Sequence, residues 1–102
     1  MAVSEIPPMR IVKVTVQKRD LILLNVEGEI VAYWDRCPHE FAPLSEGTIE
    51  DDVIVCARHL WEFEVRTGVH ISRVNRPDNN LKLVPVRIKK RMVEVDISAL
   101  QT

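Results

Sequence analysis

Several residue types are scarce in this chain. Its 102 residues include two cysteines and three glycines, and aromatic side chains make up 5%. Two cysteines form at most one disulfide, which excludes a disulfide-rich scaffold. No stretch approaches the roughly 18 consecutive apolar residues of a membrane span, and residues 1–9 lack the basic start and apolar run of a signal peptide. We therefore expect a cytoplasmic protein with no membrane contact.

The remaining composition is that of a globular domain. Hydrophobic residues make up 46% and charged residues 28% of the chain, which excludes disordered and fibrous classes. The length predicts a single domain over residues 1–102, which we expect to be a monomer. A net charge of −1 gives no indication of nucleic-acid binding.

Charge is distributed unevenly along the chain. Residues 35–64 contain eight acids and two bases, a balance of −6, whereas the other 72 residues balance to +5. An acidic segment of this kind steers a protein toward basic surfaces on its partners. Alternatively, these acids are solvated turn residues whose clustering has no function.

Short β-like runs separated by turn residues fill the sequence. No run of ten or more residues has helical periodicity, so the sequence predicts an all-β protein. Pro85 suits an edge position or a bulge because it has no amide donor. Tyr33, Trp34 and Phe63 are expected in the core. The predicted strands are residues 12–16, 21–26, 30–34, 48–49, 53–55, 61–65, 69–71, 81–88 and 92–97.

Two short segments contain both cysteines, each with a histidine nearby. They are Cys37-Pro38-His39 and Cys56-Ala57-Arg58-His59, with sixteen residues between His39 and Cys56. The order C-x-H then C-x-x-H is what a Rieske [2Fe-2S] centre needs, because two histidines replace two cysteines on one of its irons. The sequence therefore predicts one [2Fe-2S] cluster as the cofactor. The predicted metal ligands are Cys37, His39, Cys56 and His59.

Other interpretations of these four residues stay open at this point. The same side chains can form a four-coordinate zinc site, although a zinc finger groups its cysteines before its histidines. A single disulfide and a chance clustering of structural residues are the remaining alternatives. A catalytic Cys/His pair is disfavoured, because one nucleophile and one base leave the second pair unexplained. His70 lies outside both segments and is interpreted as structural or exposed.

Further motifs surround the two segments. They are Leu44-Ser45-Glu46-Gly47, Val53-Ile54-Val55-Cys56, His59-Leu60-Trp61-Glu62-Phe63 and Thr67-Gly68. With them the sequence resembles Rieske ferredoxins, most of all the ferredoxin component of multicomponent toluene and alkene monooxygenases, whose hydroxylase has a diiron site. The resemblance is strongest over residues 33–70. It implies stacked antiparallel sheets, with a cluster-binding subdomain over residues 35–70 inserted at one tip and a third loop, residues 74–80, covering the cluster.

The resemblance implies an electron carrier that performs no substrate chemistry alone. Such a ferredoxin takes one electron from a flavin-containing, NADH-dependent reductase and passes it to the diiron oxygenase hydroxylase of an aromatic or alkene oxidation system. An alternative with the same fold and ligands is the ferredoxin of a ring-hydroxylating dioxygenase. A small nitrite-reductase subunit is a further relative. A zinc-stabilised interaction module is the alternative from another class.

Departures from high-potential Rieske proteins predict a low midpoint potential. Rieske proteins of respiratory complexes have a disulfide whose positions are Ala42 and Arg58 here, and they have hydroxyl donors where this chain has Trp61 and Phe63. Without those donors the reduced cluster is less stabilised, so we expect a midpoint toward the low end of the Rieske range of about −150 to +300 mV. A redox titration measures this potential, and a midpoint well above zero would contradict the prediction.

Overall fold

The computed structural model describes residues 2–36, 43–57, 61–71 and 80–97. Over these residues the chain forms nine strands and two short 3-10 helices, and the paired strands are all antiparallel. No helix among them is long and apolar enough to cross a membrane. The elements are η1 (Val3–Glu5), β1 (Val12–Val16), β2 (Arg19–Val26), β3 (Glu29–Trp34), η2 (Leu44–Glu46), β4 (Thr48–Glu50), β5 (Val53–Val55), β6 (Glu62–Glu64), β7 (Leu83–Val84), β8 (Val86–Lys89) and β9 (Met92–Val95).

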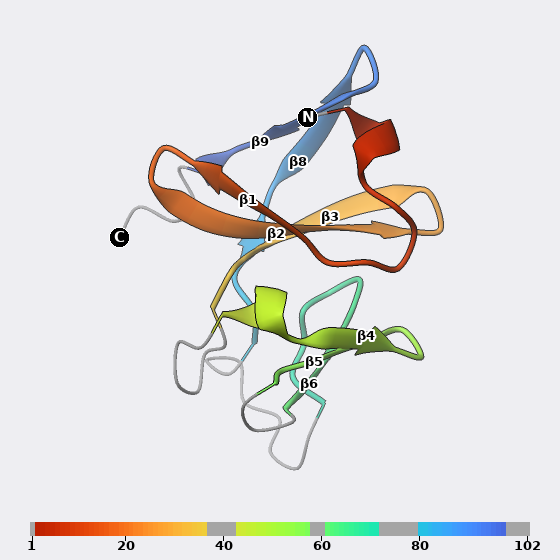
Figure 1. Ribbon diagram of the computed structural model, residues 1–102, viewed down its shortest axis with the longest axis vertical. Helices are drawn as coiled ribbons and strands as arrows, with labels where there is room; N and C mark the ends of the chain where they lie inside the picture. The colour runs from red at the N-terminus through yellow and green to blue at the C-terminus, as the bar shows by residue number, and fades with distance from the viewer. Residues whose placement is uncertain (1, 37–42, 58–60, 72–79, 98–102) are drawn as a thin grey trace.

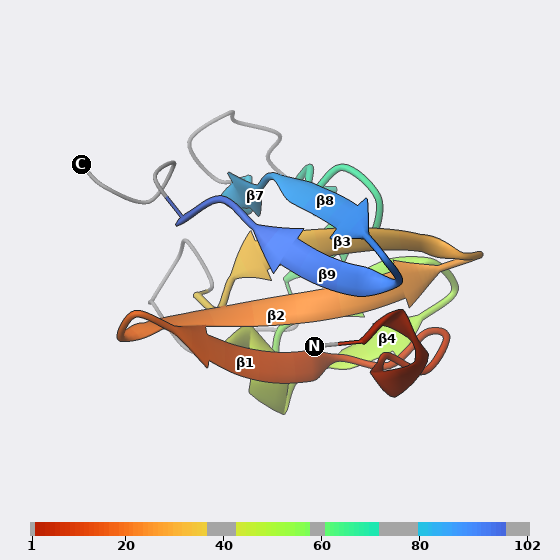
Figure 2. The same ribbon diagram turned by 90° about the horizontal axis from the view of Figure 1, so that it is seen from above.

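The strands form three sheets stacked in layers. The middle sheet has the strand order β1-β2-β3-β7, the sheet β4-β5-β6 lies on one side of it, and the hairpin β8-β9 lies on the other side (Figure 1). Seen from above, the hairpin lies across the middle sheet (Figure 2). The predicted class, all-β with stacked antiparallel sheets, is therefore confirmed.

β2 is central to this arrangement because both of its faces are buried. Leu21 and Leu23 belong to the core shared with the β8-β9 hairpin, whereas Ile22 and Leu24 belong to the core shared with β4-β5-β6. All four side chains are at most 2% exposed. Successive side chains of a strand point to opposite faces, so one continuous apolar run supplies both cores.

Three sequence predictions need correction. Residues 69–71, predicted as a strand, form only an isolated bridge between His70 and Phe63. The sequence predicts one strand over residues 81–88, but the chain divides at Pro85 into β7 of the middle sheet and β8 of the outer hairpin. Proline has no amide donor and a fixed φ, so it cannot continue a ladder and marks the crossing between layers. Trp34 is only partly buried at the end of β3, where its ring centroid lies 4.1 Å from the Arg36 guanidinium carbon. Tyr33 and Phe63 are fully buried, as predicted.

A buried hydrogen bond joins the middle sheet to the chain just after β6. The Tyr33 hydroxyl donates to the Val65 carbonyl oxygen at 2.9 Å. Burial, with smaller contributions from the charges of Glu64 and Glu29, raises the pKa of Tyr33, so its hydroxyl stays protonated. Gly68 lies against the same ring, since a Cβ there would be 2.7 Å from Tyr33 Cε1, and its φ of +74° also favours glycine.

The substitution Tyr33→Phe should destabilise the protein by about 1 to 3 kcal/mol, because it leaves a buried carbonyl without its donor. Urea unfolding of the purified protein measures this loss. Thr15→Val is the matched control, because it removes a hydroxyl from an exposed hydrogen bond to Asp20, and we expect a smaller effect. Equal unfolding midpoints for Tyr33→Phe and the wild type would contradict the prediction.

Candidate metal centre

The three-stranded sheet positions the second predicted ligand segment. Cys56 directly follows β5, and its side chain is fully buried in an apolar core with Leu44 and Phe63. The Cys56 amide donates to the Trp61 carbonyl oxygen at 2.9 Å. The segment that contains His59 therefore starts and ends at two hydrogen-bonded residues.

The first predicted ligand segment also starts and ends at fixed residues. The buried carboxylate of Asp35, directly after β3, accepts hydrogen bonds from the Ser45 amide at 2.7 Å and the Ser45 hydroxyl at 2.8 Å. Leu44 of η2 is fully buried in the same core as the thiol. Gly47 packs so closely that a Cβ there would lie 2.2 Å from the Val55 carbonyl oxygen. Leu44 and Cys56, which flank the two segments, thus share one core on the side of the middle sheet away from β8-β9 (Figure 1).

Cys56 is the one predicted ligand among the residues that the structure describes. The ligand set therefore stays a prediction, and so does a cluster-binding subdomain over residues 35–70. In the described part of the chain, no group of three or more His, Cys, Asp or Glu side chains comes together to hold a metal ion. The predicted positions outside the described residues are Cys37, His39, Ala42, Arg58, His59 and most of residues 74–80.

The environment of Cys56 fits a metal–sulfur ligand. Its side chain has 0% exposure, and its neighbours in the core are apolar. A thiolate in such a place is unfavourable unless a cation compensates its charge. A bound metal supplies that compensation, so the buried position of Cys56 and the adjacent segment containing His59 suit an iron–sulfur cluster.

A buried histidine outside the predicted ligands packs against two aromatic side chains, Trp61 and Phe63. His70 is 2% exposed, and its ring centroid lies 4.3 Å from that of Trp61 and 5.4 Å from that of Phe63. Its amide donates to Asn80 Oδ1 at 2.9 Å. His70 is therefore buried and not exposed, which fits the structural one of its two predicted interpretations. The alternation of Trp61 and Phe63 along the strand is a signal for one shared face, but it does not identify His70 as the partner.

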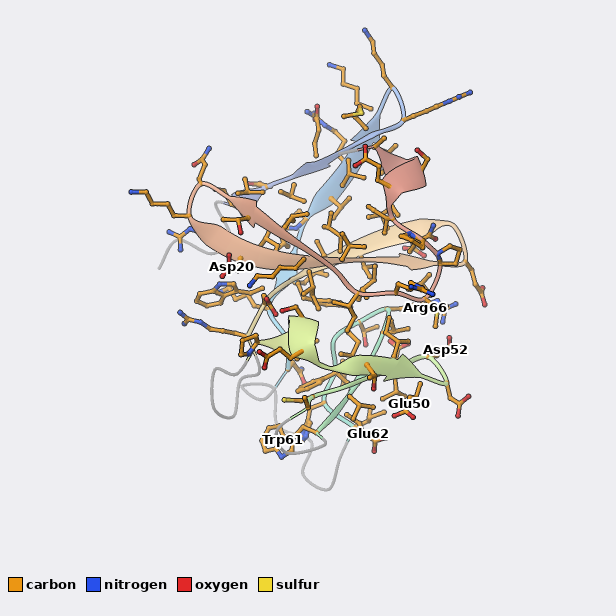
Figure 3. The ribbon with its side chains drawn as sticks, in the orientation of Figure 1. Asp20, Glu50, Asp52, Trp61, Glu62 and Arg66 are labelled. Atoms are coloured by element: carbon orange, nitrogen blue, oxygen red, sulfur yellow. The ribbon has the colours of Figure 1, made fainter. Side chains whose placement is uncertain are left out.

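Carboxylates surround the outward face of β4-β5-β6. Glu50, Val53 and Glu64 lie in one cross-strand row, and Glu62 lies opposite Val55 in the next row. Both valines are partly exposed. The labelled acids of this sheet gather in the lower half of the molecule (Figure 3). Part of the acidic segment of the sequence thus forms the outward face of β4-β5-β6, and Cys56 directly follows the middle strand of this sheet.

Glu64 also organises the turn that follows β6. Its Oε2 atom accepts hydrogen bonds from the Thr67 amide and hydroxyl, both at 2.9 Å, and from the Arg66 amide at 3.2 Å. Burial alone would raise the pKa of Glu64, but these hydrogen bonds and the Arg66 charge lower it below its ordinary value. Arg66 Nη2 in turn lies 3.1 Å from Glu27 Oε2 at the tip of the β2-β3 hairpin, so the turn is linked to the middle sheet.

Comparison with known proteins identifies the centre. Residues 1–85 match the family model of the Rieske [2Fe-2S] domain. The chain belongs to this family. The Rieske domain binds a [2Fe-2S] cluster, so the predicted cofactor is confirmed. The zinc alternative is rejected.

Individual relatives indicate which kind of Rieske protein this is. The chain is 39% identical to the biphenyl dioxygenase ferredoxin subunit of Pseudomonas sp. (strain KKS102), over 95% of this chain and 88% of that one. It matches a chain in the complex of reduced oxygenase and oxidized ferredoxin in carbazole 1,9a-dioxygenase with a TM-score of 0.79 and 34% identity, covering 93% and 96% of the two chains. The protein is a Rieske ferredoxin, an electron carrier of oxygenase systems and not a catalytic subunit.

The expected similarity to monooxygenase ferredoxins is only partial. The ferredoxin component of the alkene monooxygenase system of Xanthobacter autotrophicus (strain ATCC BAA-1158 / Py2) is 38% identical, but the match covers 59% of this chain and 50% of that one. The more extensive match is to a dioxygenase ferredoxin. The comparisons therefore favour the second of the two oxygenase interpretations drawn from the sequence.

Glu64 should make the stability of this ferredoxin depend on pH in the acid range. Its pKa in the folded state lies below the ordinary 4.5, so the stability from its hydrogen bonds is present above pH 4.5 and is lost as pH falls through the folded-state pKa. We expect Glu64→Gln to be less stable than the wild type at neutral pH and to approach it as pH falls below 4.5, in urea unfolding. Glu50→Gln, an exposed charge on β4, is the control and should show no such convergence. A difference for Glu64→Gln that stays constant over this range would contradict the prediction.

Proposed function

We propose that this ferredoxin supplies electrons to the oxygenase of a ring-hydroxylating dioxygenase system that acts on aromatic compounds. The observation that supports this most is the similarity, over 95% of the chain, to the biphenyl dioxygenase ferredoxin subunit. The electron donor would be a flavin-containing, NADH-dependent reductase. The partial match to an alkene monooxygenase ferredoxin makes a diiron hydroxylase the second candidate acceptor.

The proposed ligands divide between the two irons by residue type. We infer that Cys37 and Cys56 hold the inner iron and that His39 and His59 hold the outer one. When bound, the cluster takes up and gives off one electron. Two thiolates and two neutral imidazoles around an oxidised cluster of formal charge +2 give a neutral site, which accepts an electron more readily than four thiolates would. The fully buried thiol of Cys56 supports its inner position.

The acidic face of β4-β5-β6 supports a role in docking. Glu50 and Glu64 flank the partly exposed Val53, and Glu62 lies opposite the partly exposed Val55. Long-range attraction between this face and a basic partner surface would raise the rate of encounter. Salt screens such attraction over about 10 Å at 0.1 M, so docking through this face predicts slower electron transfer at higher ionic strength.

Reconstitution with purified partners tests the proposal. We expect this chain to stimulate substrate oxidation by a ring-hydroxylating oxygenase and its reductase, and to give less or no stimulation with a diiron hydroxylase and its own reductase. The rate of product formation is the measurement, repeated at increasing salt concentration. Cys37→Ser is the control variant, and it should lose both the visible absorbance of the cluster and the stimulation.

The outcomes of this assay separate the candidates. Stimulation of the diiron system alone would contradict the dioxygenase assignment and favour the second candidate. Stimulation that survives in Cys37→Ser would contradict the proposed ligand set. Electron transfer that does not slow with salt would exclude the acidic face as the steering surface.

A further inference from the structure

A buried carboxylate with several partners lies immediately before the first proposed ligand segment. The Asp35 side chain is 1% exposed, and it accepts both hydrogen bonds that Ser45 donates, from the amide at 2.7 Å and the hydroxyl at 2.8 Å. Lys13 Nζ lies 3.9 Å from Asp35 Oδ2 and 3.9 Å from Asp20 Oδ2. Burying a carboxylate is unfavourable unless hydrogen bonds and a cation compensate it, and both are present here.

Asp35 is fixed to the middle sheet through its backbone. Its amide donates to the Asp20 carbonyl oxygen at 2.9 Å, which continues the pairing of β2 and β3 beyond its last pair, Leu21 and Trp34. The backbone that carries the carboxylate is therefore fixed by the pairing of β2 with β3. Movement of Asp35 would require the end of this ladder to open.

Ser45, in contrast, belongs to the layer that contains the buried thiol. It follows Leu44 in η2, and Leu44 is fully buried in the core that includes Cys56. The two hydrogen bonds between Asp35 and Ser45 thus connect the middle sheet to the core of the metal centre. They also join the two ends of the segment that contains Cys37 and His39.

We propose that Asp35 is a positioning residue for electron transfer: its carboxylate holds Ser45 and thereby fixes the ligand segment between them. This inference rests on the ligand set given under the proposed function. Hydrogen bonds to a carboxylate are stronger and more directional than those between neutral groups. The contact therefore limits how far the proposed ligands Cys37 and His39 move relative to Cys56.

Four single variants of the cluster-loaded protein test the proposal. Asp35→Ala removes both acceptors, and Ser45→Ala removes only the hydroxyl. Asp35→Asn keeps an amide oxygen for the Ser45 amide and offers a donor to its hydroxyl, but it has no charge. Asp20→Asn is the matched control, because it neutralises the other carboxylate near Lys13. The Asp20 carboxylate likewise accepts a hydrogen bond from a hydroxyl, that of Thr15, at 2.7 Å.

Two measurements report on the metal centre itself. The rate of cluster loss to an iron chelator is followed by visible absorbance, and the electron paramagnetic resonance of the reduced protein reports the geometry of the ligands. We expect Asp35→Ala to lose the cluster about 10- to 100-fold faster than the wild type, from the loss of hydrogen bonds to a charged group, with a broadened resonance. Ser45→Ala and Asp35→Asn should both be intermediate, because Ser45→Ala keeps one of the two hydrogen bonds and Asp35→Asn keeps weaker, uncharged ones. Asp20→Asn should resemble the wild type.

Each contrary result has a distinct meaning. Wild-type rates and spectra for Asp35→Ala and Ser45→Ala would overturn the positioning role while leaving the proposed function intact. A shift in Asp35→Asn as large as that in Asp35→Ala would assign the effect to charge and overturn a role based on hydrogen bonds. A cluster that survives Cys37→Ser would instead overturn the ligand set. If Asp35→Ala does not fold, as judged by far-ultraviolet circular dichroism, Ser45→Ala decides the test.

Discussion

The burial of β2 on both faces is the constraint on which the three layers depend. Its run of leucine and isoleucine side chains divides between two cores, and full burial of each such side chain contributes about 1.5 to 3 kcal/mol. The outer sheets, of three and two strands, each bury the face that packs on the middle sheet. Each outer sheet is therefore stable only when it packs on the middle sheet. The packing of β4-β5-β6 on the middle sheet fixes the position of Cys56.

The sequence is most informative where the pattern is local. The predicted strands over residues 12–16, 21–26 and 30–34 match β1, β2 and β3, and the spacing of Cys37, His39, Cys56 and His59 predicts the cofactor. These signals depend on residues within a few positions of one another, or on ligand types that few metal centres share.

Other features could not be predicted because they depend on pairs that are distant in sequence. The sequence shows that Pro85 has no amide donor, but it does not show that the chain changes sheets there. The change depends on which layers β7 and β8 join, and residues far away in sequence decide this. The partly buried position of Trp34 depends on where the middle sheet ends. The contact of Asp35 with Ser45 and the stack of His70 on Trp61 join residues about ten positions apart across turns, which no periodicity encodes.

The partner class is a separate matter from the cofactor. Both candidate oxygenase systems use ferredoxins with the same ligand types, so the four ligands cannot discriminate between them. Discrimination has to come from the surface that meets the partner and from similarity over the whole chain. The match to a dioxygenase ferredoxin extends over 95% of the chain, whereas the monooxygenase match covers 59%.

The distribution of charge bears on how the protein is oriented toward its partner. A net charge of −1 produces little overall attraction to any partner, so orientation has to arise from where the charges lie. Acids concentrate on β4-β5-β6, and Lys89, Lys90 and Arg91 lie at the turn of the β8-β9 hairpin, in the layer on the opposite side of the middle sheet (Figure 1). If docking uses the acidic face as proposed, this arrangement would produce a torque in the field of a basic partner and would turn the layer that contains Cys56 toward it. The stacking of three sheets therefore does more than support the centre, because it places the Glu50, Glu62 and Glu64 cluster and the Lys89, Lys90 and Arg91 turn in opposite outer layers.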